Sequence, residues 1–519
     1  MSETHASAGH VVVVGGGVSG LAAAHRLLAG GARVTVLEGS PRVGGKLLAG
    51  ELAGVPVDFG AESMLARRPE AVDLARAAGL SGRLQPPATA SATLWTRGAL
   101  RPMPKGHVMG VPGDAEALAA SGVISEEGLA RIAREPELPP AVIGEGEDVA
   151  VGEYLADRLG REVVDRLVEP LLGGVYAGDA YRISLRAAVP QLYRLAREGR
   201  SLTEGARELQ RRAAGQPDPG PVFMGIDGGV GTLPPAVAEA CRAAGAEVAT
   251  GASVTELRRT GAGWRLVVEG PGAEKAAVAA GRPGASGASG ASGASGEPRP
   301  STGGGGSGPG RAVIEADAVV LAVPAPVAGR LLAAEAPAAA AGLAAVEYAS
   351  MALVSMVFRR ADLTPVPEGS GFLVPPVDGH TIKAATFASR KWGWIDAAAP
   401  DLFVIRTSVG RFGEEAELKR DDEGLVEVSL RDLGEAVGLR ARPVATRVTR
   451  WTGGLPQYPV GHPDRVARVR EGLAGMPSLR LCGAAYDGVG IPACIASAHG
   501  AAGAVLDTLA RSAGKDGGQ

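Results

Sequence analysis

The sequence predicts an α/β protein (α+β overall) in which the two ends of the chain build one discontinuous domain. Three observations support this fold class. A strand, a glycine turn and a helix follow one another near the start of the chain, and a similar series recurs near its end. The segments between them differ in kind, one rich in helix formers and one rich in strand-like runs. At 519 residues the chain is long enough for roughly three domains.

The composition limits the classes of partner. Hydrophobic residues make up 45% and charged residues 21%, as in ordinary globular proteins. A formal net charge of −3 provides no basic field, so we expect no nucleic-acid partner. Three cysteines without a CxxC pair, and histidines without ligand spacing, predict neither a disulfide framework nor a metal site.

The first residues carry no targeting or membrane signal. They lack a basic segment followed by an apolar run, and the valine run after them is far too short to span a bilayer. We therefore expect a cytoplasmic protein without a transmembrane segment. Peripheral membrane contact stays open.

Residues 10–40 read as strand, glycine turn, helix and second strand. Val11 to Val14 are a β-branched run typical of a strand buried on both faces. The GxGxxG turn after them allows a tight turn, close approach to a pyrophosphate, and close helix–strand packing. The N–H groups that open the helix favour a phosphate. The residues expected at the cofactor are Gly15, Gly16, Gly17, Val18, Ser19 and Gly20.

An acidic residue, Glu38, follows the second predicted strand, Arg33 to Leu37. A carboxylate at this place accepts hydrogen bonds from a ribose diol and repels a 2′-phosphate, so NADP is disfavoured. GxGxxG alone can be an ordinary turn between packed elements. Strand, turn, helix, strand and acid together predict dinucleotide binding.

The next residues resemble the amine-oxidase-like FAD superfamily. "SPRVGGKL" matches its R-x-G-G signature at Arg42, Gly44 and Gly45, and "VDFGAESML" is similar to its segment beside the flavin ring. The resemblance implies a Rossmann-type FAD-binding domain with FAD held non-covalently. It assigns cofactor contacts to Gly39, Arg42, Gly45, Lys46, Gly60, Ala61, Glu62 and Ser63.

The far end of the chain resembles the same superfamily. In "LRLCGAAYDGVGIPACIASAHG" a strand-like start, glycines and a helix return to the second phosphate and the flavin. The resemblance also implies a backbone contact from Val254 to adenine and a tryptophan, Trp451, beside the flavin. Trp451 is otherwise an ordinary core aromatic. The returning contacts are expected at Gly483, Val489, Gly490 and Ile491.

The middle of the chain makes the resemblance more specific. "TRGALRPMPKGHVMGVPG", "EPLLGGVYAGDAYRIS" and "RWTGGLPQYPVGH" look like the oxygen-dependent protoporphyrinogen and coproporphyrinogen III oxidases of haem biosynthesis. The match covers nearly the whole chain in the expected order and is strongest to the soluble bacterial coproporphyrinogen III oxidases. It implies oxidation of coproporphyrinogen III to coproporphyrin III, with six electrons passed to oxygen and peroxide formed. It leaves open a hand-over of product to a ferrochelatase.

Other activities remain open at this point. Within the family the alternative is protoporphyrinogen IX oxidation. On the same scaffold the chain could be an amine oxidase, a carotenoid desaturase or a non-enzymatic binding protein. An aromatic content of 4% argues against the aromatic cage of many amine oxidases.

The resemblance gives the glycines of "GGVYAG" a role. Gly173, Gly174 and Tyr176 would lie against the macrocycle, where a bare backbone leaves room for it. The alternative is a turn that ends the helix Val163 to Leu172, with Tyr176 in the core.

Charged residues complete the predicted site. Glu62 would face the pyrrole nitrogens and stabilise positive charge there, or would cap the following turn. Arg67, Arg68 and Lys105 would bind propionates, or would be solvated surface charges. With Arg97 and Arg101 they form a set of cations that suits the four propionates of coproporphyrinogen better than the two of protoporphyrinogen.

The pattern divides the chain into domains. The FAD-binding domain takes 1–83, 219–325 and 445–519, and the substrate-binding domain takes 84–105 and 326–444. Residues 106–218 form a helical domain, and 281–310 form a disordered low-complexity insertion between two strands.

Overall fold

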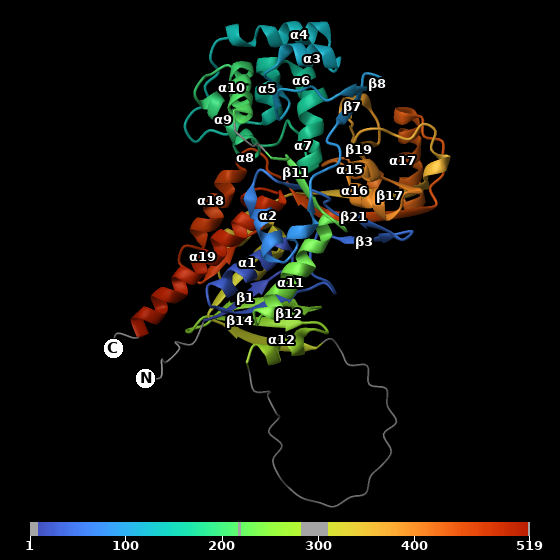
Figure 1. The fold of residues 1–519 in the computed structure, drawn as a ribbon. Helices are drawn as coiled ribbons and strands as arrows, with labels where there is room; N and C mark the ends of the chain where they lie inside the picture. Colours follow the sequence, from blue (N-terminus) through green and yellow to red (C-terminus); the bar gives the residue numbers. More distant parts are fainter. Residues whose placement is uncertain (1–8, 216–219, 282–309, 517–519) are drawn as a thin grey trace, which may run out of the picture.

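The computed structural model describes residues 9–215, 220–281 and 310–516 (Figure 1). Its helices and sheets confirm the predicted α/β class. In Figure 1 a parallel sheet lies in the lower part, a helical group at the top, and a large, mostly antiparallel sheet to one side.

A five-stranded parallel sheet joins the two ends of the chain. Its order is β12-β2-β1-β16-β22, and all its neighbours are parallel. The two predicted strands at the start of the chain are confirmed. The strands are β1 (His10–Val14), β2 (Arg33–Glu38), β12 (Glu247–Thr250), β16 (Ala318–Leu321) and β22 (Leu479–Leu481).

Helices cover one face of this sheet, and a small sheet and two more helices cover the other. The first face packs on α1 (Val18–Ala29), α11 (Leu233–Ala243) and α19 (Ile491–Asp516). The second face packs on α13 (Ala325–Leu332), α14 (Pro337–Ala344) and a sheet of β13 (Ser253–Arg259), β14 (Trp264–Glu269) and β15 (Arg311–Ala316).

The low-complexity insertion lies mostly outside the described residues, which leave out 282–309. The two strands that flank it, β14 and β15, pair antiparallel from Glu269↔Arg311 to Trp264↔Ala316. A short helix, α12 (Ala273–Ala279), follows β14.

A seven-stranded sheet forms a second core, in the order β21-β17-β20-β19-β18-β7-β8. One of its faces packs on α17 (Asp422–Val437). The strand-like runs of this part of the chain form β17 and β20. The seven strands are β21 (Ala445–Pro456), β17 (Tyr348–Arg359), β20 (Leu402–Val409), β19 (Ile382–Phe387), β18 (Gly371–Leu373), β7 (Ala92–Thr96) and β8 (Ala99–Pro102).

This sheet corrects two boundaries of the predicted domains. β21 pairs with β17 along most of its length, so residues 445–456 lie in the seven-stranded sheet and not beside the parallel one. Conversely, α13 and α14 pack in the core of the parallel sheet, although 326–444 was assigned to the substrate domain. An alternating strand pattern predicts a half-buried strand but not which sheet it joins. With these changes the domain division stays a prediction.

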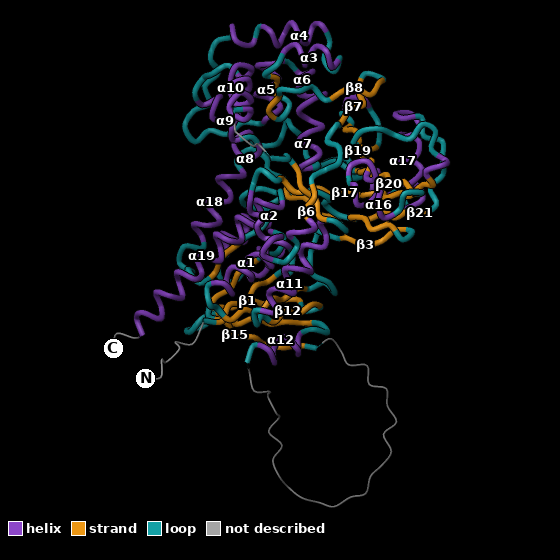
Figure 2. The backbone as a smooth tube through the Cα atoms, viewed as in Figure 1, coloured by secondary structure: helices purple, strands orange, loops and turns teal. Residues whose placement is uncertain are grey.

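The helical group lies above both sheets, where helices dominate the upper part of Figure 2. Its core is a single cluster that includes Leu155, Leu167 and Leu192. Its main helices are α3 (Ala115–Ser121), α4 (Glu126–Ala133), α5 (Val151–Leu159), α9 (Pro190–Arg197) and α10 (Leu202–Ala214).

One helix descends from this group towards the seven-stranded sheet. A π-helical turn, Val164–Val168, runs into α7 (Glu169–Tyr176), which lies against β18 and β19 (Figure 1). The alternative reading of the glycines, a turn that ends the helix after Leu172, is wrong, because the helix passes through both of them. It ends where Ala177 takes a left-handed conformation (φ 48°) and donates its N–H to the Gly173 carbonyl.

Among the described residues one helical stretch, Ile491–Ala513 of α19, is long and apolar enough to span a membrane. It meets this criterion by length and composition alone. Ile495, Ala498 and Val505 from this stretch lie in the core beside α1, so it packs as a core helix of the protein.

Candidate cofactor and substrate site

The three glycines of the first turn meet three different surroundings. A Cβ on Gly15 (φ 108°) would lie 2.5 Å from the Ala322 carbonyl oxygen, and one on Gly20 would lie 1.8 Å from the Gly15 oxygen. A Cβ on Gly17 would meet nothing within 4 Å. The outer two glycines therefore allow the tight turn and the helix packing, and the middle one faces open space, as a close phosphate approach requires.

Glu38 lies over this turn. Its carboxylate accepts the Gly16 N–H at 2.7 Å and the Ser40 N–H at 2.8 Å. Each carboxylate oxygen keeps a free lone pair, so the group can still accept from a diol. The Ala252 N–H donates to the Glu38 carbonyl at 2.8 Å, which brings the segment that leads to Val254 alongside Gly39.

The R-x-G-G segment docks on the first turn. The Gly44 N–H donates to the Gly16 carbonyl at 2.8 Å. The Arg42 guanidinium donates to the carbonyls of Val43 and Gly45, so in this structure it shapes its own loop. The Lys46 side chain, by contrast, makes no hydrogen bond or ion pair with the described residues, and desolvation by the surrounding protein lowers its pKa.

The C-terminal turn lies beside the first one. Gly483 (φ 127°) and Gly488 (φ 129°) bend the chain between β22 and α19. The nearest atom to a Cβ on Gly483 would be the Ser19 Oγ, at 3.7 Å. A Cβ on Gly490 would meet only the Pro492 Cδ, at 3.9 Å. Val489 precedes this glycine, and Ile491 begins α19. Both ends of the chain therefore present backbone to the same space.

The segment predicted to pass the flavin is fixed on both sides. A Cβ on Gly60 would lie 2.0 Å from the Lys46 carbonyl oxygen, so this position must be glycine. The Trp451 indole donates to the Phe59 carbonyl at 3.0 Å, which places that tryptophan beside the segment. Ala61 is exposed and Ser63 is half-buried.

Two cations of the seven-stranded sheet region hold Glu62. The Lys391 Nζ, at the end of α15 (Ala388–Lys391), lies 2.6 Å from Glu62 Oε1. Arg406, from the middle of β20, pairs with Glu62 Oε2 and donates to the Gly60 carbonyl at 2.7 Å. Burial alone would raise the pKa of Glu62, but the two cations lower it to about 2. The carboxylate is thus ionised and does not cap the following turn.

Lys391 and Arg406 were not among the predicted site residues. Arg406 carries a signal that could have found it, because it is a charged residue inside the apolar run "LFVIRTSV". Another cation of this region, Lys383 of β19, is only 6% exposed, and burial lowers its pKa to about 7.

The two glycines of α7 have room for a side chain. A Cβ at Gly173 or Gly174 would meet nothing within 4 Å, but only Gly174 is exposed, and Gly173 is buried. Tyr176 is 6% exposed and packs on the Tyr458 ring at 5.7 Å between centroids. The glycines therefore serve neither a turn nor a tight helix contact.

The predicted cations divide into paired and free groups. Arg68 immediately precedes α2 (Pro69–Ala77) and pairs with Glu70 at 2.6 Å, and Arg97 pairs with Glu162 at 3.0 Å. Arg101 donates to the Thr96 carbonyl. Arg67 and Lys105 are exposed, and neither side chain pairs with a residue in the described part of the chain.

Comparison with known proteins agrees with this geometry. Residues 18–286 and 301–506 match the family of flavin-containing amine oxidoreductases. The chain belongs to this family and is a flavin-dependent oxidoreductase.

Full-length relatives confirm the resemblance to the porphyrinogen oxidases. The chain is 36% identical to coproporphyrinogen III oxidase of Mycobacterium bovis, over 96% of this chain and 97% of the relative. It is 30% identical to the enzyme of that name from Bacillus subtilis, over 94% and 95%. Protoporphyrinogen oxidase of Bos taurus is 27% identical, over 96% and 98%.

Solved structures support the fold. An Exiguobacterium protein provisionally named protoporphyrinogen oxidase aligns with a TM-score of 0.77 and 31% identity, over 98% of this chain and all of that one. Cyclohexylamine oxidase from Brevibacterium oxydans aligns at 0.64 with 18% identity, over 97% and 100%, which shows the shared fold alone.

Proposed function

We propose that this protein oxidises coproporphyrinogen III to coproporphyrin III, using non-covalent FAD and molecular oxygen. The observation that carries the proposal is the 36% identity, over almost the full length of both chains, to proteins named for that reaction. Six hydrogens leave the substrate in three two-electron steps, and oxygen is reduced to peroxide.

The donor set fits FAD. The open sides of Gly17 and Gly483 provide backbone for a pyrophosphate, and the Glu38 carboxylate suits a ribose diol. The cysteines are buried, and burial raises the pKa of Cys494 to about 11 and also raises that of Cys482, so neither thiol is poised for a covalent link. The remaining cofactor contacts are proposed as assigned from the sequence.

When bound, the flavin accepts hydride equivalents and passes electrons to oxygen, so the chain's own residues need to bind, orient and shield. The open face at Gly173 and Gly174 suits a flat macrocycle at van der Waals distance. Glu62, ionised at all physiological pH values, suits stabilisation of positive charge on the pyrroles better than proton acceptance. Lys391 and Arg406 hold that carboxylate in place.

The free cations favour the four-propionate substrate. Arg67 and Lys105 are exposed and have no recorded partner in the described chain, so both are available to carboxylates. Arg68 would have to leave Glu70 to take part. We also propose a cytoplasmic enzyme whose product passes to a ferrochelatase.

Porphyrin fluorescence in air tests the proposal. Purified protein with FAD is given coproporphyrinogen III or protoporphyrinogen IX, and porphyrin formation and peroxide are followed. We expect faster oxidation of coproporphyrinogen III. Preference for protoporphyrinogen IX would support the bovine relative's reaction instead, and oxidation of neither by a flavin-loaded protein would refute a porphyrinogen substrate.

A further inference from the structure

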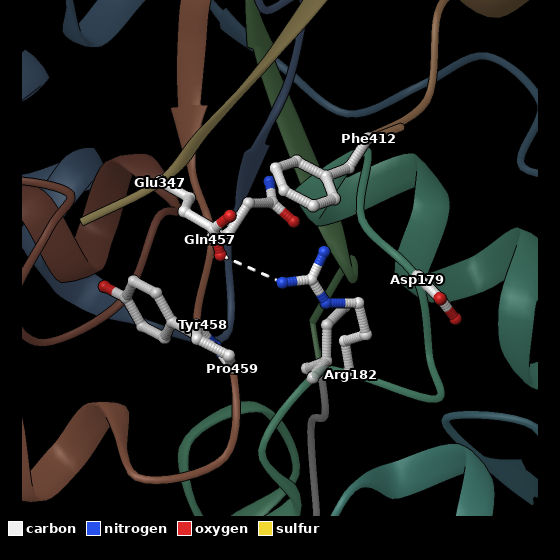
Figure 3. Close-up of a pocket in the computed structure, with 8 residues that line it drawn as sticks. Asp179, Arg182, Glu347, Phe412, Gln457, Tyr458 and Pro459 are labelled. Carbon is white, nitrogen blue, oxygen red and sulfur yellow. Dashed lines mark hydrogen bonds and ion pairs between the residues drawn. The ribbon is translucent and has the colours of Figure 1, made fainter. Parts of the chain in front are cut away.

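Two adjacent residues after β21, Gln457 and Tyr458, connect both halves of the site. Both are almost fully buried, at 5% and 2% exposure. Figure 3 shows them lining a small pocket together with the turn that carries Asp179 and Arg182 and the loop that carries Phe412.

The Tyr458 hydroxyl holds the C-terminal glycine turn from inside. It donates to the Ala484 carbonyl at 2.6 Å and accepts the Gly488 N–H at 2.9 Å. These two bonds span the bend between Gly483 and Gly488. The ring is fixed in turn by His462, stacked at 4.1 Å, whose Nε2 lies 3.0 Å from the Ala485 carbonyl.

The Gln457 amide holds the end of α7. Its Nε2 donates to the Tyr176 carbonyl at 2.8 Å. Its Oε1 lies 2.4 Å from where a Cβ on Gly178 would stand, so the amide occupies the space beside the chain just after the helix. The backbone between the two side chains is also fixed, since the Gln457 N–H donates to the Glu347 carbonyl and the Tyr458 carbonyl accepts the Ser184 N–H.

We propose that Gln457 and Tyr458 are positioning residues that set two separate parts of the site from one strand end. Tyr458 sets the backbone turn that receives FAD, and Gln457 sets the glycine face of α7 that receives the macrocycle. The assignment to substrate rests on the proposed function, whereas the assignment to FAD rests on the flavin family and the turn. Neither side chain needs to touch a reacting atom.

Substitution of each residue should therefore change one constant, the Kd for FAD or the KM for substrate, and leave the other nearly unchanged. Tyr458→Phe keeps the ring and removes both hydroxyl bonds, which leaves a partly buried N–H and a carbonyl unpaired. We expect the Kd for FAD, measured by flavin fluorescence on rebinding to apoprotein, to rise about tenfold. At saturating FAD the KM for coproporphyrinogen III should stay within about twofold.

Gln457→Met keeps the length of the side chain and removes its amide bonds. We expect the KM for coproporphyrinogen III to rise about fivefold, while the Kd for FAD stays within about twofold.

Tyr486→Phe is the matched control. Tyr486 is buried, at 7% exposure against 2% for Tyr458, and lies within the turn that Tyr458 holds, but its hydroxyl has no hydrogen-bond partner in the described part of the protein. We expect it to leave both constants unchanged. Equal FAD affinities for Tyr458→Phe and Tyr486→Phe would overturn the role of Tyr458. A Gln457→Met variant that shifts FAD affinity as much as Tyr458→Phe would overturn the separation.

Amide hydrogen exchange provides a second test if Tyr458→Phe does not fold. In wild-type apoprotein the Gly488 amide should exchange at least about tenfold more slowly than those of Val489 and Gly490, which have no recorded acceptor in the described chain. Equal rates would overturn the preformed turn. If wild type oxidises neither porphyrinogen, the proposed function fails, and the FAD measurements still decide the role of Tyr458.

Discussion

Gly20 in the first glycine turn and Gly174 in α7 both lack a side chain, but a Cβ would meet opposite surroundings at the two positions. At Gly20 it would collide with backbone 1.8 Å away, whereas at Gly174 nothing lies within 4 Å. The first absence is required by the fold, and the second leaves room for something that is not part of the chain. In the proposed site the cofactor side would thus be built from backbone, and the substrate side from an empty face and distant charges.

Two glutamates, the half-buried Glu62 and the buried Glu169, also have opposite surroundings. Glu62 lies between two cations, and its pKa falls to about 2. Glu169, in the first turn of α7, accepts the Ala180 N–H, but burial raises its pKa to about 7, and the nearby Asp165 and Asp179 add to the rise. Two identical side chains therefore hold opposite protonation preferences around one site.

The largest expected effect is at Gly174. Gly174→Leu should reduce turnover by about a hundredfold or more, because the side chain would fill the open face of α7. Fold and FAD content should persist, since leucine favours a helix over glycine by about 0.8 kcal/mol. Steady-state kinetics and the flavin spectrum measure both. Wild-type kinetics in this variant would show that the macrocycle does not use this face.

Removing the charge of Glu62 should have the next largest effect. Glu62→Gln leaves Lys391 and Arg406 without their shared anion, so we expect a loss of about 2–3 kcal/mol in stability and about a tenfold slower turnover. FAD should remain bound, because the glycine turns are untouched. Asp73→Asn is the control, since its pair with the exposed Arg76 should contribute less than about 1 kcal/mol. Slower turnover in both variants alike would remove the special role of Glu62.

The glycine turn offers a matched pair of substitutions. Gly20→Ala should destabilise the apoprotein by about 1–3 kcal/mol through overpacking. Gly17→Ala should change apoprotein stability by no more than about 0.5 kcal/mol and yet weaken FAD binding, because its Cβ points into open space. Thermal unfolding of apoprotein and FAD titration separate the two. Equal losses of stability in Gly17→Ala and Gly20→Ala would show that the two positions of the turn do not differ as Gly20 and Gly174 do.

The smallest expected effect is a pH dependence at Glu169. Its folded pKa lies above the unfolded one, so its contribution to stability is complete below about pH 4.5 and is lost as the pH rises through about 7. Glu169→Gln should remove about 1 kcal/mol of this dependence between pH 5.5 and 7, measured by thermal unfolding. Glu62 has the opposite sign, because its contribution is present above about pH 4.5 and is lost as the pH falls towards 2. An unchanged profile in Glu169→Gln would contradict the comparison of the two glutamates.

The sequence predicted the cofactor side better than the substrate side for a physical reason. The strand, the glycine turn and the acid all lie within residues 10–38, so their spacing in the sequence indicates their geometry. Glu62 and Arg406 are separated by 344 positions, and no local pattern links them. The assignment of contacts to FAD and substrate remains a prediction on both sides.

Two differences between sequence and structure come from contacts that no local pattern shows. The alternative reading of the glycine pair, a turn that ends the helix after Leu172, is wrong, because α7 continues through both glycines to Tyr176. The sequence places residues 445–456 in the FAD-binding domain, whereas β21 pairs with β17 of the seven-stranded sheet.

The order of strands in the parallel sheet also constrains how the protein is made. β1 is among the first segments synthesised, but its neighbour β16 pairs on the other side with β22, at residues 479–481. A ribosome that synthesises the chain from its N-terminus must therefore nearly finish before this sheet can close. Until then the GxGxxG turn lacks the Gly483 turn beside it, so a nascent or truncated chain should not retain flavin.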